Sequence, residues 1–553
     1  MTSGVTARPM PFLRGVASAL TFFAFGLLVQ AEPRAQEPAS IEAARAQRNR
    51  LTSGSARSFD ELEELIYGWK MKEAAPLIER YVADNPGDPR GLYLQSMRAF
   101  FEGDYTLAGD MMDQALNVGG KNPYWSQTRE IIGNTREVVS GYESHKSPKG
   151  RFEVFIEPGR DRVLLPYALE ALDVAYDELG KELGIYPPTP IRVEVYPSTS
   201  TLAKVSSLTE ENIRTSGTIA LCKYNRLMIT SPKALMRGYG WVDTLVHEYV
   251  HYAINVKAQD RVPIWMHEGM AKYLERRWRG ENQERLPPSS EHLLAERVDK
   301  NDLITFEQMH PSMAKLPSQE DAAVAFAEVY TVMEYLRATH GEGAFSKVLD
   351  NINDGHEAPE AFAMVLGTTF PKFERVWKKY LKERPRVDFP DEDLYEEKLR
   401  FEDEGSADVS DLKQIPKPAA RDHVHLGEML MARKRFGAAV AEFDKAVVLM
   451  GDTHPIVQTR LAQSLRQIGE PKRAYEALQK VRDAYPSYVV TWHELGRAAH
   501  AMGKHEEAKE ALLEAIRINP FDPAIHEDLA MVLDALGDKD GAKRERDLAK
   551  LVS

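Results

Sequence analysis

The run His-Glu-Tyr-Val-His at residues 247–251 has the residue types and the spacing to hold and use a metal ion. Apolar residues recur with helical spacing from Asp243 to Val256, so this segment is expected to form one helix. Histidines four residues apart share a helix face, with Cβ atoms roughly 5 to 6 Å apart, so both rings can reach one ion. Glu248 is turned by about 100° from His247 and can instead reach a water on the open side of the metal. We therefore expect His247 and His251 to be zinc ligands and Glu248 to be a general base.

A third ligand is expected from Glu268, which stands 17 residues after His251. That distance leaves room for the first helix to end, a loop over residues 257–263, and a second helix that Pro263 suits as a start. His267 is an adjacent competitor for the same role. Two imidazoles, one carboxylate and one open position are typical of a catalytic zinc site, in which the bound water has a pKa of about 7.

The second helix is expected to pack closely on the first. Gly269 and Ala271 flank Glu268 with almost no bulk and would permit that approach. The apolar stripe of this helix is expected to come from Trp265, Met270, Leu274 and Trp278.

On these residues the chain resembles the gluzincin metallopeptidases, and most of all the bacterial peptidase MA-like proteins that carry tetratricopeptide repeats. The specific matches are residues 245–248 and 263–271, with weaker ones at 326–336 and 366–370, inside a region from about 149 to 384. The resemblance implies an endopeptidase with one Zn²⁺ per chain. A metzincin would need a histidine where Lys257 stands, and no Gly-Ala-Met-Glu-Asn motif supports an aminopeptidase.

One position departs from the family pattern. Relatives often carry a tyrosine where this chain has Phe326, as a stabiliser of the tetrahedral oxyanion. Tyr330 lies four residues later on the same helix face and is the candidate for this role, although a tyrosine simply packed in a helix fits equally well. The departure keeps open a second reading, a scaffold or adaptor built on repeats with a catalytically weak or silent zinc domain.

The composition and the amino-terminal sequence limit the number of domains, the partners and the location of the protein. A chain of 553 residues exceeds one hydrophobic core, and a net charge of −13 argues against a nucleic-acid partner. Residues 1–31 have the basic start, the apolar run and the small residues of a secretory signal peptide, with an uncleaved anchor as the alternative. We expect a periplasmic or secreted protein without a stable membrane span once the signal is removed. Cys222 is the single cysteine, so no intramolecular disulfide forms.

Two regions repeat as helix pairs. Residues 419–553 repeat with a period of 34, seen in Gly469, Gly503 and Gly537, which is typical of about three and a half tetratricopeptide repeats. Residues 58–142 show a similar offset and predict an amino-terminal helical repeat region. Residues 32–57 read as a linker, and residues 386–418 as an acidic linker. The repeats are expected to dock a protein partner or a protein or peptide substrate.

Alternating apolar residues predict strands before the metal helix, at 152–156 and 191–195, and a hairpin that joins 219–221 to 227–229. Leucines and a tyrosine from 169 to 183 predict a helix between the first two strands. The expected fold is an α+β zincin-like metallopeptidase domain over residues 148–385, flanked by all-α tetratricopeptide-type helical repeats. The family resemblance further implies that residues 217–222 form an edge strand that holds substrate backbone, with an ordinary core strand as the alternative.

Overall fold

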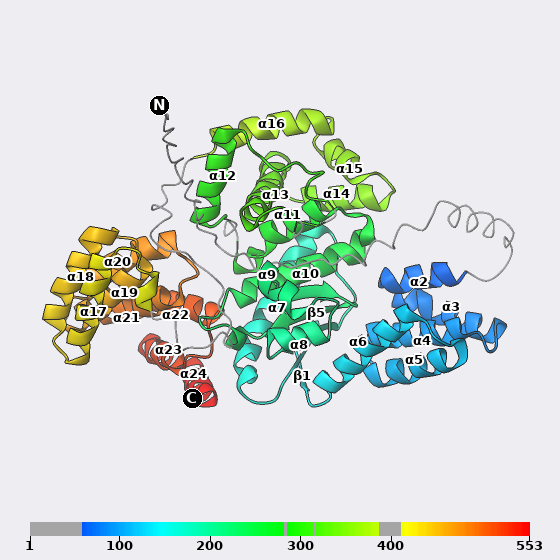
Figure 1. The fold of residues 1–553 in the computed structure, drawn as a ribbon, viewed down its shortest axis with the longest axis horizontal. Coiled ribbons are helices and arrows are strands. Elements are labelled where there is room, and N and C mark those ends of the chain that lie inside the picture. The colour runs from blue at the N-terminus through cyan, green and yellow to red at the C-terminus, as the bar shows by residue number, and fades with distance from the viewer. Residues whose placement is uncertain (1–57, 281–284, 311, 314–315, 386–410) are drawn as a thin grey trace, which may run out of the picture.

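The computed structural model describes residues 58–280, 285–310, 312–313, 316–385 and 411–553. The predicted signal peptide (1–31), the linker over 32–57 and residues 386–410 of the acidic linker lie outside the described residues. Figure 1 shows amino-terminal helices in blue, a mixed central domain in cyan and green, and carboxy-terminal helices in yellow to red. Within the described residues, no helix is both long and apolar enough to cross a membrane.

Five helices of the described chain precede the sheet. The turn between α4 and α5 shows why they end where they do: Gly103 takes a φ of 85° at the end of α4, and the Asp104 side chain accepts a hydrogen bond from the amide of Leu107 in the first turn of α5. The helical region expected over residues 58–142 is therefore present as helices. They are α2 (Phe59–Tyr67), α3 (Met71–Asp84), α4 (Pro89–Glu102), α5 (Tyr105–Gly119) and α6 (Pro123–Val139).

A five-stranded sheet with the order β1-β2-β3-β5-β4 forms the centre of the molecule. β2, β3 and β5 are parallel, whereas β1 and β4 pair antiparallel with β2 and β5. The expected strands and the hairpin are confirmed, and Tyr224 and Asn225 at the hairpin turn have φ values of 55° and 57°, as a two-residue turn between twisted strands requires. The strands are β1 (Glu143–Lys146), β2 (Phe152–Ile156), β3 (Ile191–Tyr196), β4 (Ala220–Lys223) and β5 (Arg226–Thr230).

Both faces of the sheet are covered by helices. Alternate side chains of a strand point to opposite sides, so the same strands contribute to two separate cores. Val154, Val193 and Leu227 join the core shared with α7 and α10, whereas Leu221 and Met228 join the core of the amino-terminal helices. The amino-terminal helices thus pack directly on the central sheet.

A buried charge cluster strengthens this contact. Glu194 on β3 is fully buried and lies 3.1 Å from the guanidinium of Arg226 on β5. Arg192 and the hydroxyl of Tyr105 on α5 also contact this carboxylate. Removal of one partner would leave a buried charge uncompensated, which is strongly destabilising, so the cluster fixes α5 against the sheet.

The helical part of the central domain carries the His-Glu-Tyr-Val-His run of residues 247–251. The helix expected from 169 to 183 is confirmed as α7. The helices of the central domain are α7 (Leu165–Leu183), α8 (Thr199–Lys204), α9 (Glu210–Ser216), α10 (Trp241–Ala258), α11 (Ile264–Leu274), α12 (Pro288–Lys300), α13 (Gln319–His340), α14 (Ala344–Asn353), α15 (Ala358–Val365) and α16 (Phe370–Glu383). Short 3₁₀ turns are η1 (Arg160–Leu164), η2 (Pro232–Ala234), η3 (Gln259–Arg261), η4 (Arg277–Arg279) and, before the carboxy-terminal helices, η7 (Asp411–Gln414).

Three sequence expectations for this part need correction. The motif helix starts at Trp241 and ends at Ala258, two residues beyond the expected limits at each end, so the loop before α11 is correspondingly shorter. Trp278 is not in the second helix, which ends at Leu274, but in η4. Nearly every side chain of α10 and α11 is buried, because other elements pack around both helices and leave no solvent face for an amphipathic stripe.

The carboxy-terminal region consists of four helix pairs among the described residues, rather than three and a half. Gly469, Gly503 and Gly537 adopt φ values of 81°, 76° and 86° at turns inside the pairs, which explains the periodic glycine. The helices are α17 (Pro418–Ala432), α18 (Phe436–Met450), α19 (Pro455–Gln467), α20 (Pro471–Ala484), α21 (Val489–Ala501), α22 (His505–Ile518), α23 (Pro523–Leu536) and α24 (Lys539–Val552).

Candidate metal centre

Three side chains from α10 and α11 converge at one point. The Nε2 atoms of His247 and His251 are 3.1 Å apart. Glu268 Oε2 lies 3.4 Å from Nε2 of His247 and 3.6 Å from Nε2 of His251. All three side chains are buried, and together they form a group that could hold a metal ion.

The spacing of these atoms fits a tetrahedral ion. Two ligands about 2.05 Å from such an ion lie roughly 3.3 Å apart, close to the three separations found. Glu268 Oε2 is buried and makes no hydrogen bond, and two ring nitrogens that face each other leave at least one without a proton to share. A cation at this point would satisfy all three atoms, so the residues present fit zinc.

The geometry separates Glu268 from its sequence neighbour. His267 Nδ1 lies 3.3 Å from Nδ1 of His251, on the side of that ring away from the converging Nε2 atoms. Burial and the nearby His251 lower the pKa of His267 to about 3, so His267 is neutral and can accept a hydrogen bond from His251. The structure thus places Glu268 in the group and His267 behind it.

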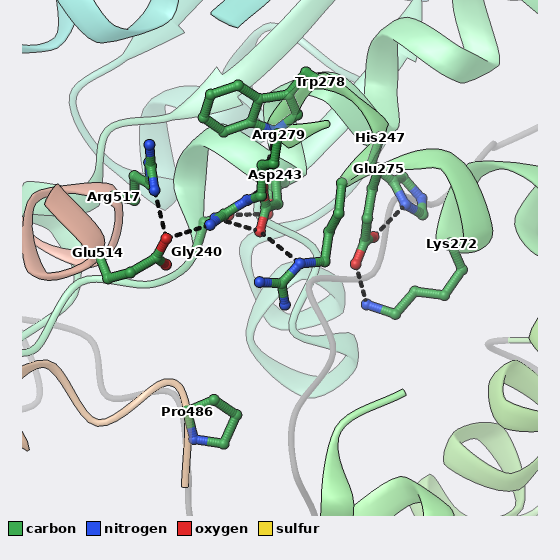
Figure 2. Close-up of polar contacts among 12 residues, drawn as sticks. Gly240, Asp243, His247, Lys272, Glu275, Trp278, Arg279, Pro486, Glu514 and Arg517 are labelled. Carbon is green, nitrogen blue, oxygen red and sulfur yellow. Dashed lines mark hydrogen bonds and ion pairs between the residues drawn. The ribbon is translucent and has the colours of Figure 1, made fainter. Parts of the chain in front are cut away.

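Glu275 orients His247 and was missed by the sequence analysis. Its Oε2 lies 3.1 Å from His247 Nδ1, and its Oε1 accepts a hydrogen bond of 2.6 Å from Lys272 (Figure 2). A carboxylate on the second ring nitrogen fixes the tautomer that presents Nε2 to a metal. The signal in the sequence was its position seven residues after Glu268, two helical turns on.

Glu248 is set up differently from the converging residues. Its side chain is 1% exposed, and neither carboxylate oxygen has a hydrogen-bond partner. Burial raises its pKa to about 8, although the neighbouring His247 acts in the opposite direction. Its charge adds to burial in raising the pKa of the Cys222 thiol on β4, so Glu248 lies toward that strand. A buried carboxylate with free lone pairs is suited to accept a proton.

β4 (Ala220–Lys223) is an edge strand, but of the residues expected to form one, 217–222, the first three lie before it. Ile219 accepts a hydrogen bond from the amide of Thr230, and opposite residues alternate between bonded and non-bonded pairs. The backbone groups of Ala220 and Cys222 therefore point away from β5. The described residues place no strand on that side. Ala220, Leu221 and Cys222 are at most 3% exposed, so other elements cover this edge, and strand addition by a substrate stays a prediction.

Gly269 has a role other than the one expected. A Cβ at this position would lie 2.9 Å from the carbonyl oxygen of Val329 and 2.9 Å from Cε of Met333, both on α13. The absence of a side chain next to Glu268 therefore allows close approach of α13. The sequence had led us to expect close approach of α10 instead.

Tyr330 is buried on α13, and its role in stabilising the oxyanion stays a prediction. Tyr330 and Phe326 both lie on α13 and are 2% exposed. The ring of Tyr330 packs against that of Tyr273 on α11, with centroids 5.4 Å apart. This contact explains its burial.

The fold joins a peptidase-like domain to helical repeats, and comparison with known families agrees. Residues 172–383 match the Peptidase MA superfamily, and residues 465–530 match the tetratricopeptide repeat. The resemblance seen in the sequence is confirmed: the chain contains a Peptidase MA superfamily domain with tetratricopeptide repeats.

Individual proteins resemble limited parts of the chain. Small glutamine-rich tetratricopeptide repeat-containing protein 2 of Mycosarcoma maydis is 26% identical over 104 residues, which cover 19% of this chain and 29% of that protein. The thermophilic repeat protein TTC0263 of Thermus thermophilus is 25% identical, with a TM-score of 0.23, and covers 24% of this chain and 75% of its own. MamA from Desulfovibrio magneticus RS-1 is 22% identical, with a TM-score of 0.23, and covers 26% and 81%.

Proposed function

We propose that this protein is an exported, zinc-dependent endopeptidase whose repeats dock a protein partner or substrate. The observation that carries the proposal is the convergence of His247, His251 and Glu268 beside a buried Glu248 with free lone pairs. The Peptidase MA match of the same region supports it.

Each residue of the site has its own role in the proposed reaction. His247, His251 and Glu268 would hold the zinc, which supplies a Lewis acid and a water of lowered pKa. Glu248 accepts the proton of the attacking water and returns it to the leaving amine. The edge strand β4 would align the substrate backbone by strand addition once the elements that cover it move aside. Tyr330 is the candidate for stabilising the oxyanion.

The experiment that tests the proposal compares the wild type with Glu248→Gln. The amide has nearly the same volume and leaves the three ligands in place but does not accept the proton. Purified wild type should contain about one zinc per chain and cleave an unfolded protein such as casein. Glu248→Gln should keep its zinc while turnover falls by about 10² to 10⁴-fold, the usual loss with a general base.

Two results would favour other readings. Equal cleavage by both forms would show that Glu248 is not the base. No cleavage by either form, with full zinc, would favour the scaffold reading, which the phenylalanine at position 326 also supports. Export is proposed from the signal-like residues 1–31, and the size and fractionation of the mature chain would test it.

A further inference from the structure

We infer that Arg279 and Glu514 are positioning residues of the metal centre, so that docking of the carboxy-terminal repeats is energetically coupled to metal binding. The inference rests on the proposed zinc site. It links a helix of the repeats, α22, to the first turn of α10, the helix that carries His247 and His251 (Figure 2).

Two parallel contacts join α10 to the segment that follows α11. His247 contacts Glu275, and four residues earlier on α10 Asp243 forms a bidentate ion pair with Arg279, four residues after Glu275. Both Arg279–Asp243 bonds are 2.8 Å long. The second contact therefore fixes the same two segments that the first must align, one helical turn away.

The outer end of this contact belongs to the repeats. Arg279 also donates a hydrogen bond to Glu514 on α22, and Arg517 contacts the same carboxylate (Figure 2). The side chain of Arg279 is only 9% exposed, and that of Glu514 20% exposed. Trp278 completes the cluster, since its indole donates a 3.0 Å hydrogen bond to Asp243 and both Arg279 and Arg517 lie 5.1 Å from its ring centroid.

Backbone contacts hold the start of α10 against the end of α22. The last carbonyl groups of a helix have no partner within the helix. On α22, the carbonyl of Ile516 accepts a 3.1 Å hydrogen bond from the indole of Trp241, and that of Ile518 accepts a 3.0 Å bond from the amide of Tyr239. Gly238 has a φ of 70°, and a Cβ there would lie 2.1 Å from the Ile518 oxygen, so only glycine fits this junction.

A second junction shows that the docking extends beyond α22. On α24, Glu545 is fully buried and accepts hydrogen bonds from Tyr167 on α7 and from His526. Arg160 of η1 donates to the carbonyl of Val552 near the end of α24. The repeats therefore meet the central domain through at least two polar contacts, and the contact at α22 is the one that leads to the metal residues.

Metal affinity measured on the full chain tests the inference. The variants are Glu514→Gln and, as a matched control, Glu510→Gln, an exposed glutamate one turn earlier on α22. We expect zinc affinity, measured by competition with a chelator, to fall about fivefold or more in Glu514→Gln, as in typical coupling between sites. The absorption spectrum of the Co²⁺-loaded protein should also change. The control should match the wild type.

Coupling between metal binding and docking of the repeats is reciprocal. The wild type alone can therefore test it, without a variant that could misfold. Zinc should increase protection from hydrogen exchange in residues 237–242 and 512–519. Unchanged exchange there, or wild-type zinc affinity and Co²⁺ spectrum in a Glu514→Gln protein that is merely less heat-stable, would overturn this inference alone. A wild type that binds no zinc would overturn the proposed function and the inference with it.

Discussion

Replacement of Glu275 by glutamine should weaken zinc binding while leaving the three ligands in place. Glu275 holds Nδ1 of His247 at 3.1 Å and is itself held by Lys272 at 2.6 Å. The amide keeps the size of the side chain but removes the negative charge that favours a proton on Nδ1. Loss of such a partner typically weakens metal affinity by 10 to 100-fold, which is about 1.4 to 2.8 kcal/mol.

The assay is zinc affinity by competition with a chelator of known strength at a fixed, mildly alkaline pH. A matched control is Glu130→Gln, an exposed position on α6 far from the site in sequence and fold. We expect the control to bind zinc as the wild type does, and Glu275→Gln to need at least about tenfold more zinc for half saturation. If the two variants bind zinc equally, Glu275 does not orient His247 and the role assigned to this contact is wrong.

Three further outcomes are expected. Gly269→Ala should destabilise the fold by about 1 to 3 kcal/mol in urea unfolding, because its Cβ meets the backbone of α13, whereas Gly437→Ala, with open space around it, should be neutral or stabilising; equal effects would contradict the packing argument. Burial raises the pKa of Glu328 to about 8 against a usual 4.5, so its contribution to stability is present below about pH 4.5 and is lost as the pH rises towards 8. Between about pH 6 and 8 the wild type should lose roughly 2 kcal/mol more than Glu328→Gln in urea unfolding, and parallel pH profiles would refute this. A fragment over residues 419–553 should give a helical circular dichroism spectrum, because the repeats have a core of their own, and a coil spectrum would show that they need the central domain.

Local patterns in the sequence predicted much of the site. Histidines at i and i+4 share a helix face whatever surrounds them, so the spacing of His247 and His251 predicts their convergence without knowledge of the fold. Alternating apolar residues and the Tyr-Asn turn likewise predict the β4–β5 hairpin, since strand periodicity and turn geometry are local properties. The period of 34 residues predicts stacked helix pairs for the same reason.

The sequence patterns gave the wrong ends for α10 and the wrong neighbour for Gly269, because both depend on residues far away in the chain. Tyr239 and Trp241 bond to carbonyl groups of α22, about 275 residues away, so the start of α10 is set by a contact that local propensity does not contain. The close neighbour of Gly269 is α13, which lies some 60 residues further along the chain.

The sequence by itself determined which residues could bind a metal, act as a base and stack as repeats, because these depend on residue type and short spacing. Only the tertiary structure decided what surrounds them: Glu275 behind His247, the edge strand β4 near Glu248, and α22 against the first turn of α10. Those neighbours come from segments far apart in the chain, and their meeting depends on how whole faces pack, which no short pattern of residues encodes.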